Sequence, residues 1–129
     1  MIPTRQAQPW ISHHLLLCAT PAKAKCCDPE LGARTWEALK RLVRELDLEN
    51  PTRPQGIVLR SKVDCLRVCE QGPVLLVWPD GIWYGGVTPE RLETIVHDHV
   101  LGGTPCQQWI LRHTPLAALN PEATIRSVG

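Results

Sequence analysis

The sequence has almost no net charge and no long apolar run, and each absence excludes a class of function. Fourteen Lys and Arg residues oppose thirteen Asp and Glu residues, which leaves a formal charge of +1. Proteins that hold nucleic acid along their surface carry a basic excess, which this chain lacks. No apolar run approaches the roughly 20 residues of a transmembrane helix. At 129 residues, we expect one soluble domain that binds neither nucleic acid nor a membrane.

The common catalytic motifs are missing as well. The chain has no Gly-rich phosphate loop, no Gly-x-Ser-x-Gly and no His-Glu-x-x-His. The Cys-x-x-Cys of a thiol oxidoreductase is also absent, because three residues separate Cys65 from Cys69. These absences predict a protein that is not an enzyme.

Cysteine is the residue type that stands out among those present. The chain has six cysteines, while residues 1–12 show no secretory signal. In a reducing compartment, clustered cysteines bind metals or do redox chemistry more often than they form disulfides. We therefore expect a cytoplasmic protein whose cysteines serve a metal or redox site.

Hydrophobic periodicity and turn signals predict two helices and five strands. Asp28-Pro29-Glu30 begins a helix that should end near Leu48, and Thr88-Pro89-Glu90 begins a second helix that ends at Gly102-Gly103. Strands are predicted at 14–18, 57–63, 74–78, 82–87 and 108–112, within a folded domain at 13–112 that follows a flexible arm at 1–12 and precedes a tail at 113–129.

The order of these elements predicts the fold. A first strand, a helix and a second strand make a parallel crossover, and the turn Pro79-Asp80-Gly81 joins the next two strands as an antiparallel hairpin. This order indicates an α/β fold, a thioredoxin-like mixed β-sheet with two main helices packed on it.

Four cysteine positions fall at the ends of these elements. Cys18 ends the first strand, Cys26 or Cys27 precedes the first helix, and Cys65 and Cys69 follow the second strand. Four thiolates at one edge of a sheet suit tetrahedral zinc or an iron–sulfur cluster. The paired Cys-x2-Cys of zinc ribbons and the spacings of bacterial and plant-type ferredoxins are absent, so spacing alone does not choose between the metals.

Several motifs together resemble the thioredoxin-like 2Fe–2S ferredoxins of the Shethna type, over roughly residues 13–105. The resemblance rests on His14 to Cys18, Lys25-Cys26-Cys27, Cys65 to Val74 with its Gly-Pro, the hairpin Trp78 to Gly85, Thr88-Pro89-Glu90 and Gly102-Gly103. The Lys-Cys-Cys-x-Pro element and a helical Trp36 are similar to cyanobacterial members.

The resemblance implies a small electron carrier that transfers one electron through a single 2Fe–2S cluster and commonly forms a homodimer. Its ligands would be Cys18, Cys65, Cys69 and Cys27, with Cys26 as an alternative to Cys27. Aligning Cys27 places Trp36 where the family carries a helical aromatic residue. Lys23, Lys25 and Arg67 stand beside these cysteines and would favour the reduced, more negative cluster, unless they are simply solvated loop residues.

Other readings stay open at this point. A structural zinc module, a thioredoxin-like dithiol protein without a cluster, and an interaction protein that has lost the cluster all fit the cysteines. Cys106 is expected to be a free thiol without a role, and His97 and His99 to be surface and core-edge residues. The aromatic residues of the hairpin Trp78 to Val87 are expected to contribute to a homodimer interface, and redox partner proteins are implied.

Overall fold

The computed structural model of the protein describes residues 10–18, 29–63 and 72–117. Both predicted helices and all five predicted strands are present there, and none of the described helices is long and apolar enough to span a membrane. The elements are β1 (Ile11–Cys18), α2 (Pro29–Glu45), β2 (Ile57–Val63), β3 (Val74–Trp78), β4 (Ile82–Tyr84), α3 (Pro89–Ile95), the π-helix η1 (Val96–Leu101), the 3₁₀ helix η2 (Gln107–Trp109) and β5 (Ile110–His113).

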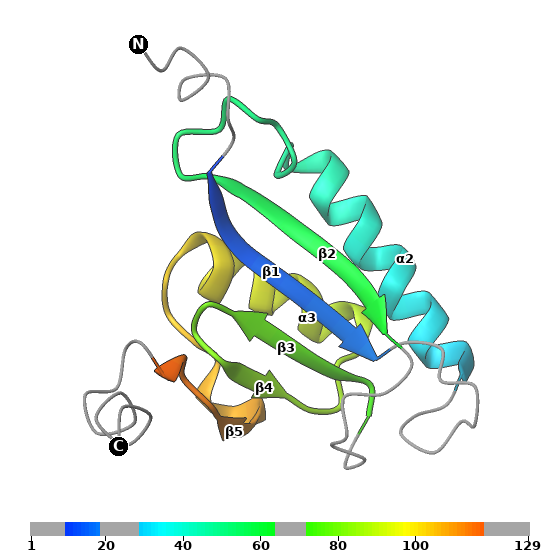
Figure 1. The fold of residues 1–129 in the computed structure, drawn as a ribbon. Helices are drawn as coiled ribbons and strands as arrows, with labels where there is room; N and C mark the ends of the chain where they lie inside the picture. The colour runs from blue at the N-terminus through cyan, green and yellow to red at the C-terminus, as the bar shows by residue number, and fades with distance from the viewer. Residues whose placement is uncertain (1–9, 19–28, 64–71, 118–129) are drawn as a thin grey trace, which may run out of the picture.

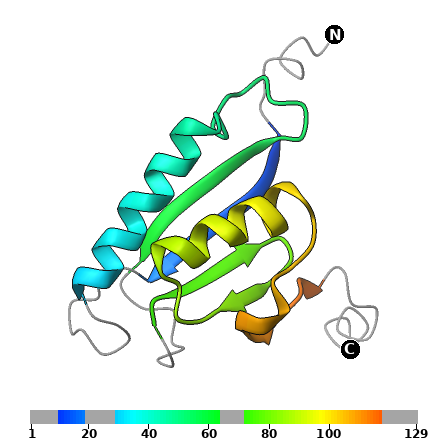
Figure 2. The same ribbon diagram turned by 180° about the vertical axis from the view of Figure 1, so that it is seen from behind.

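The strands form one mixed sheet in the order β2-β1-β3-β4-β5. β1 and β2 run parallel, connected through α2, while β3, β4 and β5 each add antiparallel to their neighbour. Figures 1 and 2 show both helices on the same face of this sheet. The arrangement confirms the predicted α/β mixed sheet with two helices packed on it.

The hydrophobic core lies between the sheet and the helices. Alternate residues of each strand point to this side, so Leu15 and Leu17 of β1 join Leu75 and Val77 of β3 in the same buried cluster. The helices supply the other half of the core through Ala38, Leu39, Leu42, Val43, Leu92, Ile95, Val96 and Val100.

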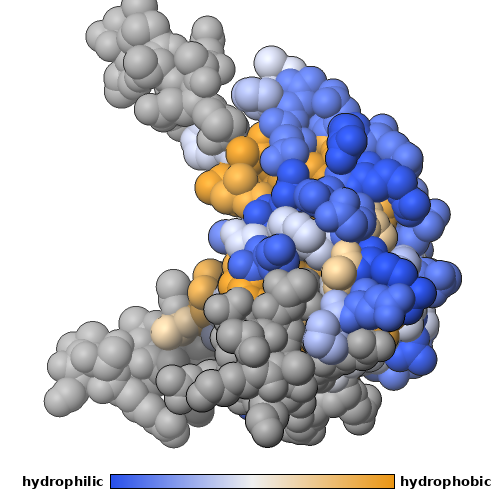
Figure 3. Space-filling model, turned by 90° about the vertical axis from the view of Figure 1, so that its right-hand side faces the viewer, coloured by the Kyte–Doolittle hydropathy of each residue, from blue (hydrophilic) through white to orange (hydrophobic). Residues whose placement is uncertain are grey.

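The opposite face of the sheet carries no helix (Figure 1). Residues paired across neighbouring strands share a face, and the pairs Leu16–Leu76 and Leu76–Trp83 identify this side. In Figure 3 the sheet face that looks toward the viewer in Figure 1 is on the left. Apolar residues gather on that side, and hydrophilic residues cover the opposite side. We call the set His14, Leu16, Cys18, Leu59, Ser61, Val63, Val74, Leu76, Trp78, Trp83, Leu111 and Arg112 the open face.

Element boundaries differ from the predicted ones where longer-range contacts act. β1 starts at Ile11, because Ile11 pairs with Ile57. α2 ends at Glu45 instead of near Leu48, because the Leu48 amide turns back to the Val43 carbonyl at 2.9 Å and Asp47 has a φ of 55°. β4 ends at Tyr84, where the pairing with β5 shifts register.

Candidate metal centre

Cys18 is the one predicted ligand that lies among the described residues. It ends β1 with 1% of its surface exposed, and it pairs with Val63 at the end of β2 and with Val74 at the start of β3. Cys18 and Val74 form a small buried cluster against which Val63, Trp83 and Leu111 pack. The thiol is therefore held in apolar surroundings on the open face.

The other predicted ligands, Cys27, Cys65 and Cys69, and the alternative Cys26, lie outside the described residues. The described ends of their segments are informative nevertheless. Segment 64–71 leaves the sheet after Val63 and returns at Gly72, two residues before Val74. Both Val63 and Val74 are lateral neighbours of Cys18, and neighbouring strands are about 4.8 Å apart.

The beginning of α2 completes this edge of the sheet. Segment 19–28 starts directly after Cys18 and ends at Pro29, the first residue of α2. Pro73 directly precedes Val74, the partner of Cys18. The Pro73 carbonyl accepts a hydrogen bond from the Val87 amide at 3.0 Å, which fixes this end of the other cysteine-bearing segment. Both cysteine-bearing segments are therefore tied at their ends to the edge where Cys18 lies. An all-thiolate donor set of this kind fits an iron–sulfur cluster, and it also fits zinc.

The two histidines of β1 do not join this donor set. His14 shares the open face with Cys18, but four residues of strand place it about 13 Å away. Its Nε2 lies 2.9 Å from the Ser61 hydroxyl. His13 points to the helical side, where its ring centroid is 6.3 Å from that of His99. In the part of the chain that the structure describes, no three His, Cys, Asp or Glu side chains are grouped to hold a metal ion.

Two cations on β2 lie beside the helical tryptophan Trp36. The guanidinium carbon of Arg60 is 5.2 Å from the centroid of the Trp36 ring, and Nζ of Lys62 is 5.9 Å from it. Lys62 directly precedes Val63, the residue paired with Cys18. Positive charge near this edge stabilises a thiolate and a negatively charged cluster. The other predicted cations, Lys23, Lys25 and Arg67, lie outside the described residues.

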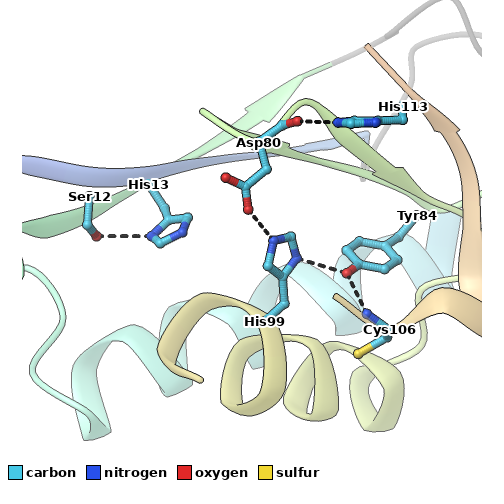
Figure 4. Close-up of polar contacts among 7 residues, drawn as sticks. All are labelled: Ser12, His13, Asp80, Tyr84, His99, Cys106 and His113. Carbon is cyan, nitrogen blue, oxygen red and sulfur yellow. Dashed lines mark hydrogen bonds and ion pairs between the residues drawn. The ribbon is translucent and has the colours of Figure 1, made fainter. Parts of the chain in front are cut away.

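A second polar constellation lies toward the opposite end of β1 (Figure 4). The Cys106 amide donates to the Tyr84 hydroxyl at 3.0 Å, and this hydroxyl lies 2.8 Å from Nδ1 of His99. Nε2 of His99 contacts the Asp80 carboxylate, and Nε2 of His113 donates to the Asp80 carbonyl at 3.0 Å. One assignment of donors and acceptors satisfies the whole network: the Tyr84 hydroxyl donates to Nδ1 of His99, and the Nε2–H of His99 donates to Asp80.

This network is structural, because its central groups are closed to solvent. Tyr84 and His99 are 0% and 1% exposed, and burial raises the pKa of Tyr84 to about 12. A phenol that stays protonated and inaccessible to solvent cannot act on a substrate. The network instead ties the π-helix η1 and Cys106 to the sheet through satisfied hydrogen bonds.

The sequence prediction missed this role of His99. His97 is exposed as expected, but His99 is buried instead of lying at the edge of the core. A signal was present, since His99 falls on the apolar face that Leu92, Ile95 and Val96 define, and a polar group in that position requires a partner. Cys106 forms no disulfide, as expected, but its backbone amide belongs to the network and burial raises the pKa of its thiol.

Comparisons with known proteins identify the family. No protein-family model matches the sequence. A 2Fe–2S ferredoxin of Clostridium pasteurianum is 34% identical over 92 residues, which cover 70% of this chain and 87% of that protein. A 2Fe–2S ferredoxin of Aquifex aeolicus is 45% identical over 47 residues, and this match spans only 42% of that ferredoxin. A solved thioredoxin-like [2Fe–2S] ferredoxin from Aquifex aeolicus superimposes with a TM-score of 0.64 at 25% identity, covering 82% of this chain and 96% of that one.

The fold is therefore thioredoxin-like, as the order of elements predicts. The chain belongs to the 2Fe–2S ferredoxins. These proteins are electron carriers and not enzymes, so the family, the cofactor and the class of function predicted from the sequence are confirmed.

Proposed function

We propose that Cys18, Cys27, Cys65 and Cys69 hold one 2Fe–2S cluster, through which the protein passes single electrons between redox partner proteins. The observation that carries this assignment is the register of β1. Cys18 pairs with Val63 and Val74, the strand residues that flank segment 64–71. The strands on both sides of that segment therefore lie beside Cys18, which supports Cys65 and Cys69 as further ligands.

A bound 2Fe–2S cluster accepts and releases one electron without a proton, and the protein controls how readily it does so. Cys18 supplies its ligand from a strand end that hydrogen bonds to two neighbours, so the ligand position is rigid. Lys62 and the N-terminus of α2 place positive potential at this edge and favour the reduced form. The apolar side chains around Cys18 act in the opposite sense, because they limit water.

Single Cys→Ser variants test the ligand assignment. The purified protein should be red-brown and contain about two iron and two sulfide per chain. Cys18→Ser, Cys65→Ser and Cys69→Ser should each lose most of this iron or change the spectrum of the reduced cluster. Cys106→Ser is the matched control and should keep the parent spectrum. Cys106 is also buried, but its backbone amide bonds to Tyr84 in the polar network and it is not a predicted ligand.

The pair Cys26→Ser and Cys27→Ser decides the second ligand. We expect Cys27→Ser to be impaired and Cys26→Ser to be normal, while the reverse result would assign Cys26. A colourless protein with one zinc per chain would replace the electron carrier by a structural zinc module. A metal-free protein whose thiols titrate reversibly would indicate a dithiol protein.

We further propose that a second copy of the chain covers the open face. Its hairpin residues Trp78 and Trp83 are only partly buried, as are Leu16 and Leu59 on the neighbouring strands. Adjacent to them, Ile11 is 60% exposed. A helix-free apolar sheet face of this kind is the type of surface that homodimers bury.

Sedimentation of two charge variants tests the dimer. Trp78→Glu places a charge on the open face and should produce monomers at micromolar concentration. Leu101→Glu is the control, because Leu101 is equally apolar and 39% exposed but lies on η1, in the helical layer. A parent protein that sediments as a monomer contradicts this proposal.

A reducing cytoplasmic location completes the proposal. Thiolates that bind iron must not be oxidised to disulfides before the cluster is inserted. Fractionation of the source cells should therefore recover the protein with the soluble cytoplasm, and recovery in an oxidising compartment would contradict it.

A further inference from the structure

The apolar cover over Cys18 comes from three strands besides its own. Val63 of β2, Trp83 of β4 and Leu111 of β5 pack against the pair that Cys18 forms with Val74. Trp83 is by far the largest of these side chains, and it reaches the pair diagonally from its position opposite Leu76. The indole is therefore part of the apolar layer that packs over Cys18 and Val74 on the open face.

Trp83 is held in place by the segment that follows β5. Its Nε1–H donates to the Thr114 hydroxyl at 2.7 Å. The Thr114 amide in turn donates to the Gly81 carbonyl at 2.7 Å. Thr114 thus ties the indole to the same hairpin from which Trp83 extends, although the sequence places Thr114 in a predicted tail.

We propose that Trp83, oriented by Thr114, is a positioning residue for electron transfer that excludes water from the Cys18 side of the cluster and thereby lowers its reduction potential. This inference rests on the proposed function, because it requires Cys18 as a ligand. Reduction adds one negative charge to the cluster, and that charge is less stable where fewer water dipoles surround it. Removing the indole admits water and favours the reduced form.

Trp78 provides a matched control on the same face. It is also a partly buried tryptophan of the β3–β4 hairpin, but it pairs with His14, four residues along β1 from Cys18. Replacing Trp78 therefore also removes a partly buried indole from the open face. It leaves the cover over Cys18 in place.

The experiment measures the midpoint potential of the cluster-loaded protein and of the variants Trp83→Leu, Trp83→Phe, Thr114→Val and Trp78→Leu. Trp83→Leu should shift the reduction equilibrium about tenfold toward the reduced form, which is an upward shift of about 59 mV for one electron. Trp83→Phe should restore most of the parent potential, and Thr114→Val should shift it in the same direction by a smaller amount. Trp78→Leu should keep it.

Pulsed EPR of the reduced proteins in D2O gives a second readout, since deuterium modulation reports water near the cluster. It should increase for Trp83→Leu and stay unchanged for Trp78→Leu. If the iron, sulfide and reduced spectrum of Trp83→Leu are normal but its potential shifts less than about threefold in the reduction equilibrium, the inference is wrong while the cluster assignment stands. If Trp83→Leu does not load a cluster, Thr114→Val decides, because Thr114 is exposed; an unchanged potential and modulation would overturn the inference.

Discussion

The hydroxyl of Tyr84 is the point where the buried polar network is most sensitive to a single change. Tyr84→Phe keeps the ring, which is fully buried in the core, and removes only the oxygen. That oxygen accepts from the Cys106 amide and contacts Nδ1 of His99. The substitution therefore leaves two buried polar groups without their partner.

An unsatisfied buried polar group costs about 1–3 kcal/mol. Two such groups, offset in part because the phenyl ring has no hydroxyl to desolvate, give a predicted loss of about 2–4 kcal/mol in the free energy of unfolding. For a domain of this size, each kcal/mol lowers Tm by about 4 °C, so the expected decrease is roughly 8–16 °C.

Thermal unfolding of the cluster-loaded protein, followed by circular dichroism, measures this loss. Thr35→Val is the matched control, because the Thr35 hydroxyl is also buried but donates a single hydrogen bond, 2.9 Å to the Val87 carbonyl. It should cost about 1 kcal/mol. If Tyr84→Phe costs no more than Thr35→Val, the network does not carry the stability assigned to it.

Three further results are expected. Tyr84 is the only tyrosine of the chain, so ultraviolet titration of the folded protein should show phenol ionisation near pH 12, against about 10 in denaturant; a folded midpoint near 10 would mean that the hydroxyl is accessible. Burial lowers the pKa of His13 below its ordinary 6.5, so the unfolded chain binds the proton first and stability should fall as the pH decreases below 6.5; His13→Gln should reduce this slope, and an unchanged slope would refute the argument. Gly81 has a φ of +70°, and a Cβ there would meet the Thr114 carbonyl oxygen at 2.1 Å. Denaturant unfolding should therefore show that Gly81→Ala lowers the free energy of unfolding by well over the roughly 1 kcal/mol expected for Gly103→Ala, where φ is +79° and the space around the residue is open. Equal losses for the two variants would contradict the clash.

The sequence was sufficient for the fold because its signals are local. Pro29 begins α2 as predicted, and Thr88 caps α3 by accepting a hydrogen bond from the Arg91 amide at 3.2 Å. The hairpin turns at Gly81, whose amide donates to the Val77 carbonyl. Caps, prolines and turn glycines act within a few residues, so pattern and propensity locate them.

Features that depend on distant partners were not predictable. The π-helical geometry of Val96–Leu101 accompanies the burial of His99 against Asp80, nineteen residues earlier. Thr114 is tied to Trp83 across thirty-one residues, although polarity assigned it to a tail. Such contacts depend on strand order and register, which the sequence pattern does not encode residue by residue.

The candidate site divides in the same way. The apolar pattern of the sequence predicts that a strand ends at Cys18. The register of the sheet then pairs Cys18 with Val63 on one side and Val74 on the other. The choice between Cys26 and Cys27 involves adjacent residues in a segment without a period, so neither the pattern nor the described residues resolve it. The preference for iron–sulfur over zinc came from the resemblance, and the ferredoxin relatives support it.

The visible and EPR spectra of the protein before and after reduction with dithionite test the central claim most directly. The account predicts a red-brown protein that bleaches on reduction and then shows about one unpaired spin per chain, with about two iron and two sulfide per chain. A colourless protein with one zinc, no sulfide and no EPR signal after dithionite would contradict it.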